Sequence, residues 1–187
     1  MLYCFLLCTA AVVLDQVSKL IVINTIAEGE IIEVIKNVLT FTYLENKGAA
    51  FGMLADQRWV FMVVSVVAIA AIFFYLWKEK PESMFVKTTL ALILGGGIGN
   101  MIDRIFRPGV VDFIDVEFFC YPEVSFEGGF SITLADFPVF NIADCFITVG
   151  CAVLICYLLF VEFPKEAKAE KEKKAAKLQE KEQKNEQ

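Results

Sequence analysis

Histidine is absent from all 187 residues, and this absence excludes several classes of enzyme. Ser-His-Asp and Cys-His nucleophile systems need an imidazole base, and zinc sites of the HExxH kind need histidine ligands. If the chain is an enzyme, its proton transfers must be made by Asp, Glu, Lys or Tyr side chains.

The cysteines lack the spacing of a metal knuckle or of an extracellular disulfide framework. There are six, namely Cys4, Cys8, Cys120, Cys145, Cys151 and Cys156. All but Cys120 lie in or beside apolar stretches. We interpret these as small buried hydrophobic side chains and predict no metal site.

Charged residues are scarce in four long apolar blocks, at about 2–23, 59–77, 85–105 and 142–162. Hydrophobic residues make up 57% of the chain, against about 45–50% in soluble domains. Each block has roughly the 20 residues needed to cross a hydrocarbon core. The sequence therefore predicts an all-α integral membrane protein with four transmembrane helices, rather than a soluble helical core.

The segments outside these blocks differ in character. Residues 24–57 are rich in Ile, Val, Thr, Phe and Tyr, which favours short strands, and Gly128-Gly129 suggests a hairpin within the 117–137 loop. After Pro164 the chain consists mainly of Lys, Glu, Ala and Gln. We predict one membrane domain over 1–163 and a charged, disordered cytoplasmic tail over 164–187.

The distribution of basic residues predicts the orientation in the membrane. Eight of the 17 Lys and Arg residues lie after position 162, and Lys78, Lys80 and Lys87 flank the turn between the second and third blocks. Basic residues near membrane ends are commoner on the cytoplasmic side, so both termini are predicted to be cytoplasmic. Five polar residues would then meet at the outer interface, namely Asn46, Arg104, Asp112, Asn141 and Asp144.

This polar group suggests acid–base chemistry. Ionisable groups at a membrane edge are costly, so they indicate a function. Two carboxylates that share one proton can hydrolyse a peptide, one acting as base and the other as acid. Asp112 and Asp144 are the candidates, and three further carboxylates that spacing does not exclude are Asp103, Asp115 and Asp136.

Several of these residues also have simpler interpretations. Asp144 follows Asn141 by three positions, as in the first turn of a capped helix, where a negative charge meets the helix dipole. Asp15 and Lys19 share a helix face and can neutralise each other. Ser18 and Lys19 are adjacent and do not face each other, which disfavours a Ser-Lys dyad.

Five short motifs occur in a fixed order between residues 15 and 150. They are Asp15-Gln16-Val17-Ser18-Lys19, Asn46-Lys47-Gly48-Ala49-Ala50-Phe51, Gly99-Asn100-Met101-Ile102-Asp103-Arg104, Val110-Val111-Asp112-Phe113 and Phe140-Asn141-Ile142-Ala143-Asp144. Together they resemble the signature blocks of the lipoprotein signal peptidase (signal peptidase II) family. Each motif alone is weak, but five in the family's order are specific.

This resemblance implies a bacterial inner-membrane aspartic endopeptidase with four spanning helices and a small extracytoplasmic β-rich cradle. Such enzymes remove the signal peptide from diacylglyceryl-modified prolipoproteins and cut just before the lipidated cysteine, without a metal or cofactor. The expected partners are lipid-modified prolipoprotein signal peptides and membrane lipid, not nucleic acid, and the expected state is a monomer.

The resemblance also assigns the site. It implies that Asp112 and Asp144 are catalytic, and that the supporting residues are Lys19, Asn46, Gly48, Asn100, Arg104 and Asn141. The chain departs from the family pattern in its longer 117–137 loop and in its tail. Two rival classes are a small transporter or channel subunit and a non-catalytic scaffold. The first would place charges deep within several spans, and the second and fourth blocks have none in their middles.

Overall fold

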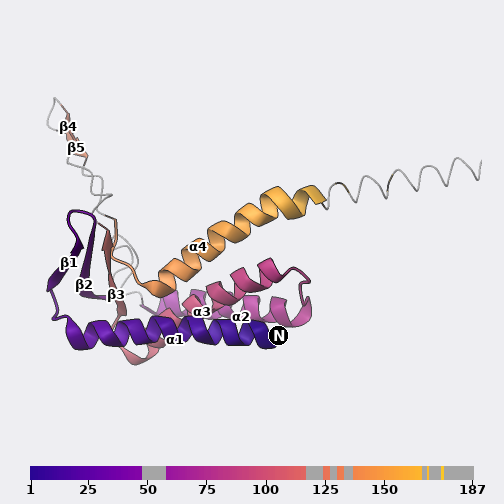
Figure 1. Cartoon of the computed structure of the whole chain (residues 1–187), viewed down its shortest axis with the longest axis horizontal. Coiled ribbons are helices and arrows are strands. Elements are labelled where there is room, and N and C mark those ends of the chain that lie inside the picture. Colours follow the sequence, from indigo (N-terminus) through magenta and orange to yellow (C-terminus); the bar gives the residue numbers. More distant parts are fainter. Residues whose placement is uncertain are drawn as a thin grey trace, which may run out of the picture. The chain divides into compact units, whose positions relative to one another are not determined.

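A computed structural model describes residues 1–47, 58–116, 124–126, 130–132 and 137–165, together with residues 168 and 174. Its helices are α1 Leu2–Thr25, α2 Arg58–Lys78, α3 Met84–Phe106 and α4 Ile142–Tyr157, and the π-helical segment η3 Leu158–Glu162 follows α4 (Figure 1). Within the described ranges, four helices are long and apolar enough to cross a membrane, as the sequence predicts. By its contacts the chain divides into two compact units, Met1–Gly150 and Cys151–Gln187. The first unit holds α1, α2, α3 and the three-stranded sheet.

Helix α3 is the central helix of this unit. Most of α3 is buried, whereas α1 and α2 expose many large apolar side chains, as membrane spans do. Glycines on α3 allow its neighbours to come close. A Cβ atom on Gly95 would lie 2.6 Å from the Ala11 Cβ, and one on Gly96 would lie 2.5 Å from the Ala143 carbonyl oxygen. Helix α3 therefore packs directly on α1 and on the start of α4.

Three strands form an antiparallel sheet in the order β1-β2-β3. They are β1 Ile31–Ile35, β2 Leu39–Asn46 and β3 Val110–Val116, and Figure 1 shows them at the C-terminal end of α1. On β3, Val111 and Phe113 pack against Val22 of α1 and against Ile26, the C-cap residue of that helix. Because side chains alternate along a strand, Asp112 points away from this apolar contact, as its place between two apolar residues predicts.

A second, two-stranded antiparallel sheet pairs β4 Val124–Phe126 with β5 Phe130–Ile132. These strands agree with the hairpin predicted in this segment. Its turn at Gly128-Gly129 lies outside the described residues, as does most of the remaining 117–137 loop.

An irregularity in the β2–β3 ladder places Asn46 beside Asp112. Phe41 pairs with Ile114 and Leu44 pairs with Asp112, so three steps on β2 match two on β3. The extra residue is a β-bulge. If the pairing of Phe41 with Ile114 continued along the ladder without a bulge, Asn46 would be one position out of step. Its side chain would then point to the face of the sheet opposite Asp112. The bulge keeps both side chains on one face.

Candidate active site

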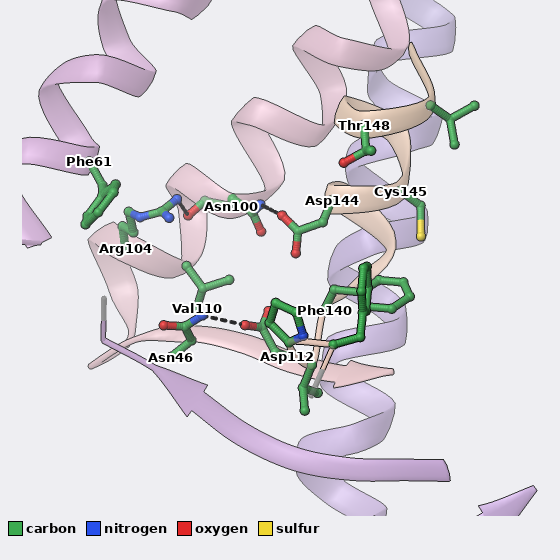
Figure 2. A pocket seen from close by; sticks show the side chains of 14 residues that line it. Asn46, Phe61, Asn100, Arg104, Val110, Asp112, Phe140, Asp144, Cys145 and Thr148 are labelled. Carbon is green, nitrogen blue, oxygen red and sulfur yellow. Dashed lines mark hydrogen bonds between the residues drawn. The ribbon is translucent and has the colours of Figure 1, made fainter. Parts of the chain in front are cut away.

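A cavity of about 560 Å³ holds both carboxylates that the sequence singles out. Asp112 reaches it from β3 and Asp144 from the first turn of α4, and Figure 2 shows the two side chains directed into the same space. Much of the remaining wall is apolar and includes Phe61, Val110 and Phe140. The volume lies within the range of about 300–1,000 Å³ that is usual for ligand sites.

Asp112 is held by two side-chain amides and is almost completely buried. Its Oδ1 accepts a hydrogen bond from Asn141 Nδ2 at 2.7 Å, and its Oδ2 accepts one from Asn46 Nδ2 at 2.9 Å. Only 2% of the residue is exposed. Burial raises the pKa of Asp112 to about 7; the charge of Asp144 also raises it, and the two amide hydrogen bonds lower it. This carboxyl group can therefore carry a proton near neutral pH.

Asp144 is both part of a helix cap and part of the cavity wall. Its Oδ1 accepts a hydrogen bond from Asn100 Nδ2 at 2.7 Å, and its Oδ2 accepts one from the Asn141 backbone N–H at 3.2 Å. In return, the Asp144 backbone N–H donates to Asn141 Oδ1 at 3.0 Å. This reciprocal pair resembles a capping box and confirms Asn141 as the N-cap of α4. The capping interpretation of Asp144 and its place beside Asp112 are thus compatible.

The orientation of the Asn100 amide is determined by a buried ammonium group. Lys19 Nζ lies 2.9 Å from Asn100 Oδ1, and Asn141 Nδ2 donates to the same oxygen at 3.1 Å. An ammonium group only donates, so the amide oxygen must face Lys19 and the amide nitrogen must face Asp144. For Asn141, the Asp144 backbone N–H occupies Oδ1 and leaves Nδ2 for Asp112.

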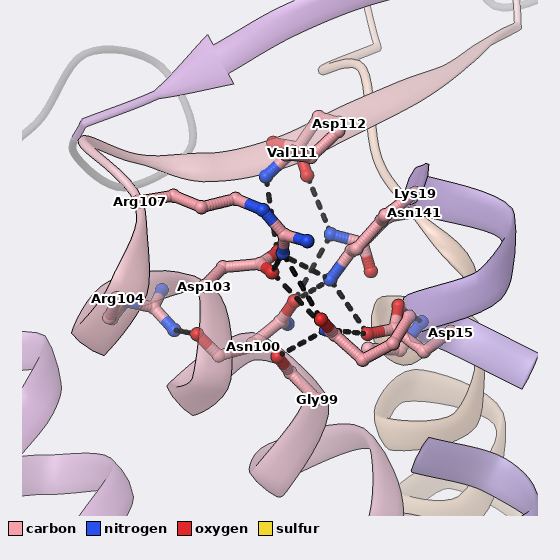
Figure 3. A network of polar contacts seen from close by, with 12 residues as sticks. Asp15, Lys19, Gly99, Asn100, Asp103, Arg104, Arg107, Val111, Asp112 and Asn141 are labelled. Carbon is pink, nitrogen blue, oxygen red and sulfur yellow. Dashed lines mark hydrogen bonds and ion pairs between the residues drawn. The ribbon is translucent and has the colours of Figure 1, made fainter. Parts of the chain in front are cut away.

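Lys19 lies between two carboxylates (Figure 3). Its Nζ is 2.9 Å from Asp15 Oδ2 and 2.8 Å from Asp103 Oδ2, and all three side chains are 0% exposed. The predicted Asp15–Lys19 pairing is confirmed. Asp103, which competed with Asp112 and Asp144 as a candidate, does not line the cavity and instead binds Lys19.

This buried cluster also holds the backbone next to each cavity aspartate. Asp103 Oδ2 accepts the backbone N–H of Val111 at 3.2 Å, directly before Asp112. Asp15 Oδ1 accepts the backbone N–H of Ala143 at 3.1 Å, directly before Asp144. The cluster therefore connects α1 and α3 to the starts of β3 and α4.

The other candidates are distributed as follows. Arg104 lines the cavity, donates to the Asn100 carbonyl oxygen at 3.3 Å and has its guanidinium carbon 5.8 Å from the centroid of the Phe61 ring. Asp115 accepts a hydrogen bond from Thr40 Oγ1 at 3.4 Å and does not line the cavity. Gly48 and Asp136 lie outside the described residues.

Sequence reasoning did not include Gln16 and Arg107 in the site. Gln16 Nε2 donates to Asp15 Oδ2 at 3.0 Å and to Asp103 Oδ1 at 3.2 Å, and Arg107 forms an ion pair with Asp103. The sequence spacing could have indicated the Asp103–Arg107 ion pair, because the two residues are four positions apart and share a helix face.

The described part of the chain contains no cluster of three or more His, Cys, Asp or Glu side chains suited to a metal ion.

The fold and the site are those of a multi-pass membrane protein with two carboxylates in an apolar cavity. A solved structure titled "Bacterial membrane enzyme structure by the in meso method at 1.9 A resolution" matches it with a TM-score of 0.72 and 32% identity. The match covers 86% of this chain and 95% of the other. The two chains are therefore similar in amino-acid sequence as well as in fold.

The family model described as Signal peptidase (SPase) II matches residues 7–160. The lipoprotein signal peptidase of Geobacillus kaustophilus is 41% identical over 155 residues, which are 83% of this chain and 92% of the relative. That of Halalkalibacterium halodurans is 38% identical over 171 residues, or 91% of this chain and 98% of the relative. The chain belongs to the signal peptidase II family and is therefore a peptidase, which confirms the resemblance seen in its motifs.

Proposed function

We propose that this chain is a membrane aspartic endopeptidase that removes the signal peptide from diacylglyceryl-modified bacterial prolipoproteins. It cuts the peptide bond just before the lipidated cysteine. The observation that carries the proposal is the pairing of Asp112 and Asp144 in one apolar cavity, each held by side-chain amides. The relatives named lipoprotein signal peptidase support the choice of substrate.

In this mechanism the two carboxylates share one proton, and the raised pKa of Asp112 favours the neutral acid at that residue. Ionised Asp144 takes a proton from water as the water oxygen attacks the scissile carbonyl carbon. Neutral Asp112 donates its proton to the carbonyl oxygen. When the tetrahedral intermediate collapses, the C–N bond breaks and Asp144 returns its proton to the leaving amine. One of the two hydroxyl protons of the intermediate goes back to Asp112, which restores the starting state, and the other stays on the new carboxylic acid.

The cavity walls support a lipid-linked, apolar substrate. Phe61, Val110, Phe140 and Val149 offer apolar surface on several sides of the carboxylates. Such walls exclude water and strengthen the electrostatic interactions of the reacting groups. We assign Lys19, Asn46, Asn100, Arg104 and Asn141, and by family resemblance Gly48, to support of the two aspartates and of the substrate backbone.

We also propose the orientation of the chain in the membrane and the bounds of its peptidase domain. Residues 1–163 form the peptidase domain, with residues 164–187 as a charged tail. Both termini lie in the cytoplasm and the cavity opens at the outer face of the bacterial cell membrane, because Lys and Arg concentrate in the 78–87 turn and in the tail. The enzyme acts as a monomer in contact with membrane lipid.

The direct test is cleavage of a diacylglyceryl-modified prolipoprotein by the purified chain in reconstituted membranes, followed by a gel shift. Asp112→Asn and Asp144→Asn are each expected to lower the rate by at least about a thousandfold, because neither variant can share a proton between two carboxylates. Asp115→Asn is the matched control on the same strand and is expected to stay within about twofold of the unmodified enzyme. Normal turnover by either of the first two variants would contradict the assignment.

The same assay separates the rival classes. A transporter subunit or a scaffold would not cleave the prolipoprotein at all. The unlipidated precursor is the second control, and cleavage at an equal rate would contradict the proposed requirement for the lipid.

A further inference from the structure

Arg107 directly follows α3 and contacts the buried cluster of Asp15, Lys19 and Asp103. Its Nη1 forms an ion pair with Asp103 Oδ1 (Figure 3). The same nitrogen donates to Gln16 Oε1 at 3.1 Å. The side chain is 19% exposed, so it connects the cluster to the molecular surface. Arg107 lies outside all five sequence motifs.

Without Arg107, the cluster would hold two carboxylates and one ammonium group. Asp15 and Asp103 are two fully buried carboxylates, and Lys19 is the single cation between them. A buried charge without a partner is strongly destabilising. Arg107 supplies the missing positive charge through its ion pair with Asp103.

Arg107 is also connected to both cavity aspartates. Through Asp103 it reaches the backbone N–H of Val111, the residue before Asp112. Through Gln16 and Asp15 it reaches the backbone N–H of Ala143, the residue before Asp144. These are short chains of hydrogen bonds whose members are largely buried.

We infer that Arg107 is a positioning residue for the Asp112–Asp144 pair, acting through Asp103 and Gln16 without touching either aspartate. The inference rests on the proposed function. Without the guanidinium group, Asp103 Oδ1 is held by the Gln16 amide and no longer by a charge. The carboxylate can then rotate and withdraw Oδ2 from its position between the Lys19 ammonium and the Val111 N–H. The Val111 N–H then loses its acceptor, and the start of β3 shifts relative to α4.

The test compares Arg107→Met and Arg107→Lys in the full-length, membrane-reconstituted protein, with the lipidated prolipoprotein as substrate. Arg107→Met is expected to lower kcat about tenfold per folded enzyme and to change KM by less than about twofold, because a small misplacement of reacting groups affects the chemical step. Arg107→Lys keeps the charge and is expected to recover most of this loss. Lys36→Met is the control, since Lys36 is an exposed cation on the loop after β1.

Two results would overturn the inference. One is a kcat for Arg107→Met equal to that of the unmodified enzyme, even if its melting temperature falls, since this would leave Arg107 a purely stabilising role. The other is a raised KM at unchanged kcat. If Arg107→Met does not accumulate in the membrane, Arg107→Gln retains a donor for Asp103 without the charge. An unchanged kcat in that variant would equally overturn the inference.

Asp112→Asn in the same assay separates this inference from the proposed function. If Asp112→Asn cleaves normally, the proposed function fails whatever Arg107 does. If Asp112→Asn is inactive and Arg107→Met is fully active, only the role of Arg107 is wrong.

Discussion

Lys19 Nζ lies 2.9 Å from Asn100 Oδ1, and this contact determines which end of the Asn100 amide faces Asp144. The ammonium group cannot accept a hydrogen bond, so it attracts the oxygen and leaves the nitrogen to donate to the carboxylate. A fully buried lysine on α1 thereby controls the hydrogen bonding of an aspartate on α4 through a residue on α3.

Replacing Lys19 with Met should impair both stability and cleavage. It leaves Asp15 and Asp103 without their shared buried cation, which is expected to cost about 3–5 kcal/mol of unfolding free energy. The Asn100 amide is also free to turn its oxygen toward Asp144. We expect cleavage to fall by about a hundredfold or more in protein that remains folded, as measured by rates corrected for the folded fraction.

Ser18→Ala is the matched control for that experiment. The Ser18 hydroxyl donates to the Asp15 carbonyl oxygen within its own helix at 2.7 Å, and Lys19 is engaged by Asp15, Asp103 and Asn100. Cleavage by Ser18→Ala should remain within about twofold of normal. Loss of activity in this variant would revive the Ser-Lys dyad that the sequence disfavours.

The raised pKa of Asp112 predicts a pH-dependent stability. Its ordinary pKa is about 4 in the unfolded chain, and burial raises it to about 7 in the folded protein. Between these values the folded state binds more protons, so the contribution of Asp112 to stability declines as the pH rises from about 4 to 7. Asp112→Asn removes this titration. The melting temperature of the variant minus that of the unmodified protein should increase from pH 4 to pH 8, and a constant difference would contradict the assignment.

Two neighbouring glycines on α3 should respond differently to alanine. A Cβ on Gly96 would meet the Ala143 carbonyl oxygen at 2.5 Å and Ile147 Cγ1 at 2.9 Å, so the first turn of α4 must move. Among the described residues, a Cβ on Gly97 would meet Ile69 Cγ1 at 3.4 Å and Ile69 Cδ1 at 3.8 Å, which are ordinary contacts. Gly96→Ala is expected to lower cleavage about tenfold or more because Asp144 shifts with α4. Gly97→Ala should cleave normally and melt at the same or a slightly higher temperature.

Single-residue deletions in β2 test the bulge. Deleting Thr42 removes the extra residue and leaves the pairing of Leu44 with Asp112 intact, so Asn46 stays on the face of Asp112. Deleting Glu45 moves Asn46 by one position and turns its side chain to the opposite face. The first variant is expected to retain measurable cleavage and the second to behave like Asn46→Ala. Equal activity of the two deletions would show that Asn46 is not needed beside Asp112.

Much of this architecture could be predicted from local patterns. Apolar runs of about 20 residues have one stable solution in a bilayer, which is why the four helices were predictable with small errors at their ends. The N-cap at Asn141 and the pairing of Asp15 with Lys19 depend on spacings of three and four residues within one helix, and both are confirmed. The roles of Asp112 and Asp144 stay a prediction, although the two side chains do share a cavity.

The sequence by itself determined the membrane class, the family and the set of polar residues from which a site could be built. Apart from the family resemblance, residue spacing could not distinguish Asp103 from Asp112, because both carboxylates lie at or just after the end of the same apolar block. Only the tertiary structure decided this: Lys19, which is 84 positions before Asp103 in the chain, binds one carboxylate, while Asn46 and Asn141 hold the other in the cavity. Such contacts between distant segments depend on helix packing and strand register, and neither is encoded in the spacing of residues along one element.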